Sequence, residues 1–260
     1  MAKGDFYIVL AIVFVFGSII GSFLNVCIYR IPAGLSIVSP PSRCGHCETM
    51  LRWYHNVPIL SFLVLRRRCA FCRVKISWRY PLIEALNGGL FVLVFYFYGI
   101  SLPTLVFFLF VSALVVITFI DLDHQIIPDV ISLSGIVVGF GCSFVLPWLS
   151  WQDSLYGILL GGGSLFAVAA GYELLTKKQG MGGGDIKLLA MLGAFLGWKA
   201  VLPIIFLSSL VGTLIGVPLM LIKGENGRLA IPFGPFLALA SVVYLFWGPA
   251  IIRWYLSCYY

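Results

Sequence analysis

Residues 103–120 read PTLVFFLFVSALVVITFI, eighteen consecutive residues without a charged side chain. A helix needs about 20 predominantly apolar residues, within a range of roughly 17–25, to span the hydrocarbon core of a bilayer. The stretch therefore predicts a transmembrane helix. Because apolar residues occur here in long runs and not in alternation with polar ones, the pattern excludes a transmembrane β-barrel.

The composition of the whole chain is also that of a membrane protein. Of its 260 residues, 61% are hydrophobic and 10% are charged, whereas soluble domains have roughly 45–50% apolar and about 25% charged residues. The apolar excess has to face lipid, which excludes soluble, disordered, collagen-like and ordinary secreted proteins. We expect an all-α polytopic membrane protein with about eight transmembrane helices, at residues 6–28, 82–98, 103–120, 130–147, 154–175, 186–198, 201–222 and 233–256.

The basic residues predict how the chain is oriented in the membrane. Residues 30–80 form the one sizeable polar segment, which carries nine Lys and Arg but a single acidic residue, Glu48. Loops rich in Lys and Arg remain in the cytoplasm. With this segment inside, 14 of the 17 basic residues lie on the cytoplasmic side, and Lys3, Lys199 and Arg253 lie outside. The net charge of +7 then orients the protein and contacts anionic lipid headgroups of the bilayer, and we expect no nucleic-acid partner.

Four of the seven cysteines form two C-x-x-C pairs in this polar segment, separated by residues 48–68. Such pairs resemble a zinc ribbon, in which four thiolates complete a tetrahedral Zn²⁺ site and leave no open position. A segment of about 50 residues has too small a core to fold easily without a metal. We therefore expect a small cytoplasmic zinc-ribbon-like insertion between the first two helices, with unpaired or redox cysteines as the alternatives and His46 and His55 as spare ligands. The expected ligands of this structural zinc are Cys44, Cys47, Cys69 and Cys72.

Two aspartates lie at the cytoplasmic edge of the predicted membrane region. Asp121 follows the span 103–120, and Asp185 follows the glycine-rich run 180–184 and opens the span 186–198. Ionisable residues in or beside spans are functional candidates. Two carboxylates that share one proton can hydrolyse an amide, because one takes a proton from water while the other polarises the carbonyl. The alternative is that both are solvated helix caps, a role for which Asp185 is well placed.

Other polar residues near these aspartates have structural and functional interpretations. Asp129 suits the start of a helix, and Asp123 and His124 fit a solvated turn. Glu84 lies about one turn into the span 82–98, where it either stabilises the helix dipole or binds a ligand that faces the cysteine segment. Glycines beside Asp185 leave the backbone uncovered, so that an extended peptide substrate can approach: Gly182, Gly183 and Gly184.

Five motifs together resemble one family. Gly17–Pro32, the two C-x-x-C pairs, Arg79–Glu84, Asp121–Asp129 and Gly182–Lys187 are similar, in this order, to the motifs of bacterial prepilin peptidases. These are the type IV leader peptidases and N-methyltransferases, which are aspartic peptidases with a G-x-G-D motif. The resemblance runs from about residue 10 to about residue 240. It divides the chain into three expected parts: a first transmembrane helix (1–29), a cytoplasmic zinc-binding segment associated with methyl transfer (30–80) and a transmembrane peptidase domain (81–260).

The resemblance implies a reaction and a place for it. Asp121 and Asp185 would remove the leader of type IV prepilins or type II secretion pseudopilins at the cytoplasmic face of the bacterial inner membrane. The new N-terminal residue would then be methylated from S-adenosylmethionine, for which we expect a non-Rossmann pocket between the zinc segment and Glu84. Arg67 stands where the family often has a glycine, in a neighbourhood associated with methyl transfer. A peptidase without methyl transfer and a non-enzymatic transporter or assembly protein are the alternatives.

Overall fold

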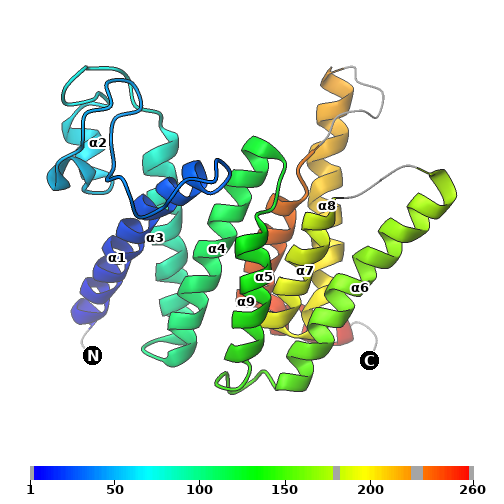
Figure 1. Ribbon diagram of the computed structural model, residues 1–260. Coiled ribbons are helices and arrows are strands. Elements are labelled where there is room, and N and C mark those ends of the chain that lie inside the picture. Colours follow the sequence, from blue (N-terminus) through cyan, green and yellow to red (C-terminus); the bar gives the residue numbers. More distant parts are fainter. Residues whose placement is uncertain (1–2, 178–181, 224–230, 258–260) are drawn as a thin grey trace. The chain divides into compact units, whose positions relative to one another are not determined.

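The computed structural model describes residues 3–177, 182–223 and 231–257, and these residues form helices without β-strands. Isolated β-bridges pair Arg43 with Met50 and Arg68 with Lys75. Figure 1 labels most of the elements, which follow one another as α1 Lys3–Arg30, η1 Trp53–Asn56, α2 Leu60–Val64, α3 Arg79–Tyr98, α4 Leu102–His124, α5 Asp129–Cys142, α6 Trp151–Thr176, α7 Gly183–Leu196, α8 Trp198–Lys223 and α9 Gly234–Ser257.

Within the described residues, six helices are long and apolar enough to cross a membrane: α1, α3, α4, α6, α8 and α9. The helices α5 and α7 have 14 residues each. At 1.5 Å per residue each is about 21 Å long, which is less than the roughly 30 Å of the hydrocarbon core. Each predicted span coincides with one of these eight helices, which confirms the all-α polytopic fold class. Of the basic residues used to orient the chain, Lys178 and Arg228 lie outside the described residues.

The chain divides into two compact units, residues 1–116 and 117–260, and the expected domain boundaries at 29 and 80 stay a prediction. In the first unit, α1 packs along α3. A Cβ on Gly21 would lie only 2.8 Å from the Cα of Glu84, so glycine allows the two backbones to approach. The amide of Asn87, fully buried on α3, donates to the carbonyl of Gly17 at 2.7 Å.

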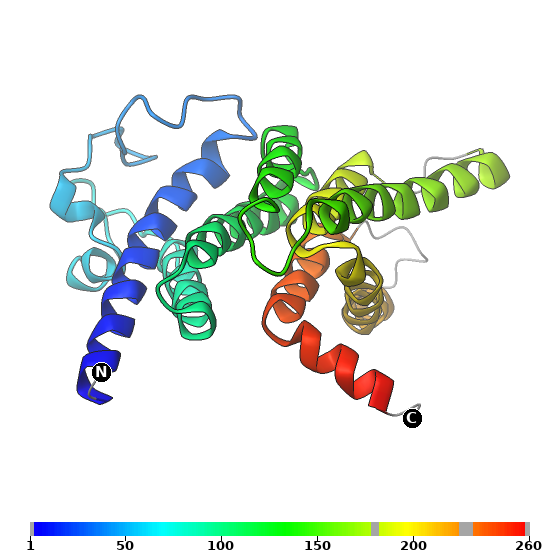
Figure 2. The same cartoon turned by 90° about the horizontal axis from the view of Figure 1, so that it is seen from below.

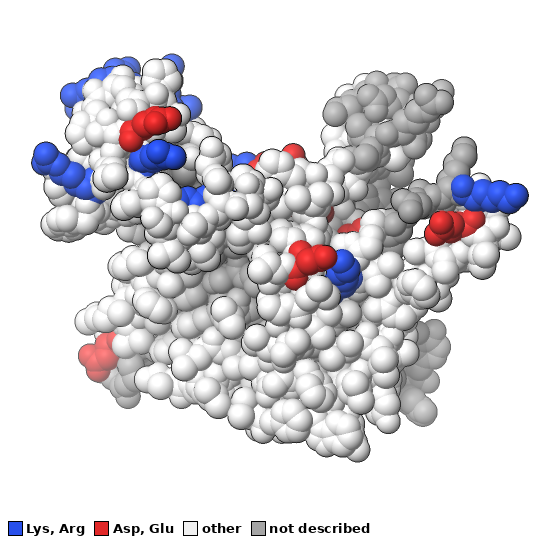
Figure 3. Space-filling model, viewed as in Figure 1, with Lys and Arg blue, Asp and Glu red and all other residues white. Residues whose placement is uncertain are grey.

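The segment between α1 and α3 contains the four cysteines of the C-x-x-C pairs. Figure 3 shows Lys and Arg side chains gathered over this segment, in agreement with the basic composition of residues 30–80. Its regular structure is limited to η1, α2 and the two isolated bridges. Backbone hydrogen bonds within its turns hold the segment, but a segment of this size has a small hydrophobic core, which is the situation that a metal or a ligand stabilises.

In the second unit, α7 is the central helix, and it packs against α5, α6, α8 and α9. Figure 2 shows α6 and α7 crossing in a second view. Every residue from Leu188 to Phe195 is buried. A Cβ on Gly157 of α6 would collide with the carbonyl oxygen of Gly193 on α7, so these two backbones are in direct contact. The first turn of α7 carries Asp185, which is therefore held by the most closely packed helix of the unit.

Candidate active site and cysteine cluster

Asp121 lies near the end of α4 and is 5% exposed. Its Oδ2 accepts a hydrogen bond of 2.9 Å from the backbone N–H of Gly234, the first residue of α9. A Cβ on Gly234 would lie 2.6 Å from that oxygen, a distance that real contacts do not allow. A larger residue at the start of α9 would therefore have to displace the carboxylate or the helix start, and the sequence alone does not indicate this contact.

Asp185 is the third residue of α7 and is half-buried. The Asp121 carboxylate interacts electrostatically with that of Asp185. Ile127 lies beside the start of α7, which carries Asp185, and beside the start of α9, which hydrogen-bonds Asp121. Its Cβ lies 3.0 Å from the Cβ position of Gly184, and its Cδ1 lies 3.4 Å from that of Gly234. The structure thus brings together the two aspartates that the sequence placed at one depth.

The glycines before Asp185 differ in their surroundings. Among the described residues, no heavy atom lies within 4 Å of the Cβ positions of Gly182 and Gly183. Gly184 packs instead against Ile127, as described above. None of the three glycines has the positive φ that favours glycine. A peptide substrate could therefore use the open space beside Gly182 and Gly183, whereas the backbone conformation here is an ordinary one.

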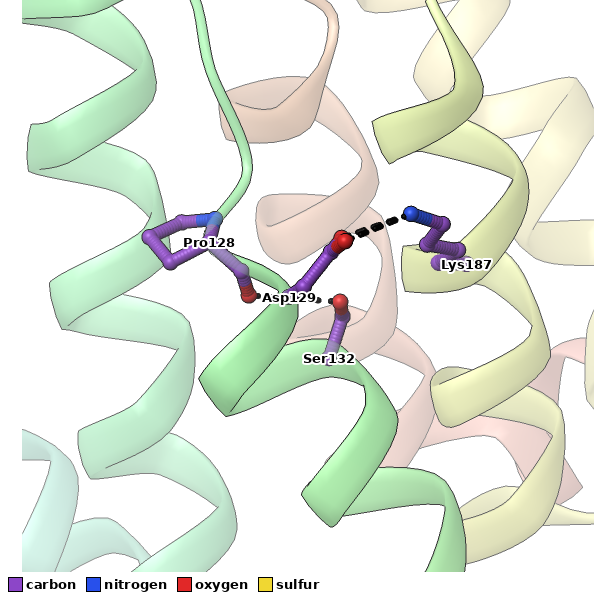
Figure 4. A network of polar contacts seen from close by, with 4 residues as sticks. All are labelled: Pro128, Asp129, Ser132 and Lys187. Atoms are coloured by element: carbon purple, nitrogen blue, oxygen red, sulfur yellow. Dashed lines mark hydrogen bonds and ion pairs between the residues drawn. The ribbon is translucent and has the colours of Figure 1, made fainter. Parts of the chain in front are cut away.

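An ion pair connects the starts of α5 and α7 (Figure 4). Lys187 Nζ lies 2.7 and 2.8 Å from the two carboxylate oxygens of Asp129, and the side chains are 38% and 56% exposed respectively. The hydroxyl of Ser132 donates to the Pro128 carbonyl in the same turn. Asp129 is thus the first residue of α5, in agreement with its predicted place at the start of a helix. It also forms a contact between two helices, which the sequence did not predict. Asp123 and His124 are exposed at the end of α4.

The four cysteine sulfurs in the segment between α1 and α3 form one cluster. All four Sγ atoms lie within 4.8 Å of one another, and those of Cys44 and Cys72 are 3.9 Å apart. Zinc–sulfur bonds of about 2.3 Å in a tetrahedron place sulfurs about 3.8 Å apart. The cluster therefore has the donor atoms and nearly the dimensions of a tetrathiolate metal site.

Both C-x-x-C pairs have the same backbone geometry. The N–H of Cys44 donates to the Thr49 carbonyl, and the N–H of Cys69 donates to the equivalent Val74 carbonyl. In each pair the residue after the second cysteine, Glu48 or Arg73, has a positive φ, of 53° and 60°. Two turns of identical construction thus present their sulfurs to one point.

The pKa values of two of these cysteines are shifted in opposite directions. Hydrogen bonding from Thr49 lowers the pKa of Cys47 to about 6. A hydrogen bond from the Val74 backbone lowers the pKa of Cys72, but burial and the three neighbouring sulfurs raise it by more, to about 11. Four thiolates so close together repel one another until a metal ion neutralises them.

Glu84 of α3 is buried, with 8% exposure. Its Oε2 accepts a hydrogen bond of 2.7 Å from the N–H of Ile59, and Ser22 of α1 also hydrogen-bonds this carboxylate. Ile59 precedes α2 with a φ of 60°. Glu84 therefore fixes the start of α2, and at the same time it lines a cavity of about 610 Å³ between the cysteine segment and the ends of α1 and α3.

The fold and these sites define a class of protein: a polytopic helical membrane protein with an interacting carboxylate pair and a four-cysteine cluster. Two family models match the chain, the bacterial peptidase A24 N-terminal domain over residues 15–98 and the type IV leader peptidase family over residues 108–217. The second of these contains both aspartates, and the first contains all four clustered cysteines.

Curated relatives match over nearly the full length. Proteins named prepilin leader peptidase/N-methyltransferase are 38% identical in Aeromonas hydrophila, over 99% of this chain and 97% of the relative, and 37% identical in Pseudomonas putida, over 91% and 90%. One from Neisseria gonorrhoeae is 36% identical over 94% and 93%. This chain belongs to the type IV leader peptidase family, which confirms the resemblance found in its motifs. No solved structure matches the chain significantly.

Proposed function

We propose that Asp121 and Asp185 form the catalytic pair of a prepilin leader peptidase, and that the same chain N-methylates the N terminus that cleavage creates. The single observation that carries the peptidase assignment is the interaction of these two carboxylates, one in the last turn of α4 and the other in the first turn of α7. Family membership supports both activities, because the curated relatives carry both in their names. The substrates are prepilins or type II secretion pseudopilins.

The carboxylate pair supplies acid and base for hydrolysis of one peptide bond. One carboxylate accepts a proton from water as the water oxygen attacks the scissile carbonyl. The other, protonated, donates a hydrogen bond to the carbonyl oxygen and later provides the proton for the leaving amine. The Gly234 N–H holds Asp121 in place, and the packed helix α7 holds Asp185, so the pair is positioned before substrate binds.

The substrate reaches the pair from the cytoplasmic side of the inner membrane. The basic segment 30–80 supports this orientation, because excess Lys and Arg mark cytoplasmic loops. Prepilin leaders are basic and precede an apolar membrane helix, so their cleavage site lies at the same interface. Open space beside the first two residues of the glycine run Gly182, Gly183 and Gly184 supports their role in binding the extended leader.

The first unit supports the methyl-transfer assignment. Cys44, Cys47, Cys69 and Cys72 would hold one structural zinc ion, which fits the four-sulfur geometry. S-adenosylmethionine supplies a methyl group from a sulfonium centre, and the adjoining cavity of about 610 Å³ lies within the roughly 300–1,000 Å³ typical of small-molecule pockets. Glu84 lines this cavity and is positioned to stabilise a cationic ligand.

The test is cleavage and methylation of a purified prepilin by the purified full-length protein. Asp121→Asn and Asp185→Asn should each abolish cleavage while the protein still inserts and retains its metal. Near-normal cleavage by either variant would remove that residue from the catalytic pair. Cleavage without methylation would identify a peptidase alone, and a wild-type protein with neither activity would favour a transporter or assembly protein.

A further inference from the structure

Arg30, the last residue of α1, has a buried charge without a counter-ion. Its exposure is 9%, whereas the neighbouring Tyr29 is 72% exposed. The guanidinium donates to the carbonyls of Ser36 at 2.8 Å and Pro40 at 2.7 Å, and no carboxylate in the described parts of the chain forms an ion pair with it. A buried charge is costly unless it is paired, so this cation lacks an anionic partner.

Arg30 and Glu84 both line the cavity of about 610 Å³ in the first unit. Both residues are almost completely buried, with exposures of 9% and 8%. Because a buried charge is costly unless it is paired, a buried cation and a buried anion in the lining of one cavity indicate a polar ligand that carries both charges.

We propose that this cavity binds the amino-acid end of S-adenosylmethionine, with the Arg30 guanidinium holding its α-carboxylate. The proposal rests on the methyl-transfer function proposed above. The two carbonyl contacts use two of the five N–H groups of the guanidinium, and the remaining three can form a bidentate pair with a carboxylate. Glu84 then faces the cationic part of the ligand, so that the donor is oriented by both of its charges.

The position of Arg30 argues against a role in lipid binding. It ends a membrane-spanning helix, where an outward arginine would contact lipid phosphates. Its guanidinium instead holds the loop carbonyls of Ser36 and Pro40 and is almost completely enclosed. Because these contacts fix the planar group on the cavity wall, little side-chain freedom is lost when a carboxylate binds.

The experiment compares two ligands on the zinc-loaded full-length protein in nanodiscs: S-adenosylmethionine and its decarboxylated form, measured by equilibrium binding. We expect the wild-type protein to bind the decarboxylated form about 10- to 100-fold more weakly, which is what one charge-assisted bidentate pair supplies. This comparison needs no substitution. Equal affinity for both ligands would overturn the role of Arg30 and leave methyl transfer intact. Failure to bind either ligand, together with absent methylation, would reject the methyl-donor site itself.

Two variants test whether Arg30 is the residue that distinguishes S-adenosylmethionine from its decarboxylated form. Arg30→Gln should bind both ligands equally, because it has lost the group that recognises the carboxylate. Arg52→Gln is the matched control: Arg52 belongs to the same segment, its exposed guanidinium donates to the Tyr54 hydroxyl at 2.7 Å, and it does not line the cavity, so the discrimination should remain. Zinc content measured on each variant reports the folding of this segment. If Arg30→Gln loses its zinc, Arg30→Lys is used in its place, and its discrimination should fall below that of the wild type because lysine retains the charge but not the bidentate geometry. Discrimination that persists without Arg30 would refute the proposal.

Discussion

The contact between Gly234 and Asp121 gives a sharp prediction, because a single methyl group should disturb the catalytic pair. Gly234→Ala would place a Cβ 2.6 Å from Oδ2 and 3.2 Å from Cγ of Asp121. Ordinary contact begins at 3.4 Å, so the carboxylate or the start of α9 has to move by about 0.8 Å, the difference between these distances. The 2.9 Å hydrogen bond from the Gly234 N–H would then be lost or distorted.

The size of the effect follows from that hydrogen bond. Hydrogen bonds to charged groups contribute about 1.5–3 kcal/mol. At 1.36 kcal/mol for each factor of ten in rate, the loss corresponds to a decrease of about 10- to 150-fold in kcat/KM for leader cleavage. A displacement close to 1 Å at a catalytic group has a cost of about 10²-fold, which agrees with this range.

The assay is the initial rate of cleavage of a purified prepilin, with thermal unfolding followed by circular dichroism on the same preparation to report folding. The matched control is Gly163→Ala in α6, because no atom of the described residues lies within 4 Å of that Cβ position and alanine is the better helix former. Its cleavage rate should be that of the wild type. A folded Gly234→Ala protein that cleaves within about twofold of wild type would refute the assigned geometry, since loss of a hydrogen bond to a charged group should lower the rate at least about tenfold.

Three further predictions concern the metal, the ion pair and the two activities. Elemental analysis should find one zinc per chain in the wild-type protein and less in Cys69→Ser. Because metal binding contributes to the folding free energy of such a segment, residues 40–75 of Cys69→Ser should be cleaved faster by an added protease. Wild-type protein without metal would contradict the zinc site. Asp129→Asn breaks an exposed ion pair worth about 0.2–1 kcal/mol, so cleavage should fall by no more than about fivefold, and complete inactivation would indicate a direct catalytic role. Glu84→Gln should lower methylation of an already cleaved pilin more than it lowers cleavage, and Asp185→Asn should do the reverse; equal loss of both activities in Glu84→Gln would contradict this separation.

The helices and the cysteine cluster were predictable because local pattern determines them. In lipid a backbone segment has to satisfy its own hydrogen bonds, so an apolar run such as 103–120 has almost no alternative to a helix. The C-x-x-C spacing likewise fixes which sulfurs can meet. The internal geometry of the turns was less accessible, since Glu48 and Arg73 have positive φ values that their residue types do not suggest.

The contacts that position the aspartates could not be predicted, because each joins residues far apart in the chain. Gly234 and Asp121 are separated by 113 positions, and Lys187 and Asp129 by 58. A glycine before a proline at the start of a helix is common for local reasons, so nothing in residues 231–235 indicates a carboxylate at 2.9 Å. The sequence identified the carboxylates by type and depth, whereas their partners depend on how α4, α7 and α9 pack.

The hydrogen bond that Glu84 accepts determines how substitutions of this residue are interpreted. From sequence it was either a helix-dipole residue or a ligand-binding carboxylate, and the structure adds its hydrogen bond from the Ile59 N–H at 2.7 Å. Glutamine retains a carbonyl oxygen that can accept this bond but lacks the negative charge. Reduced methylation in Glu84→Gln would therefore report the charge that faces the cavity. Reduced methylation in Glu84→Ala alone would report the start of α2, because only that change leaves the Ile59 N–H without its partner.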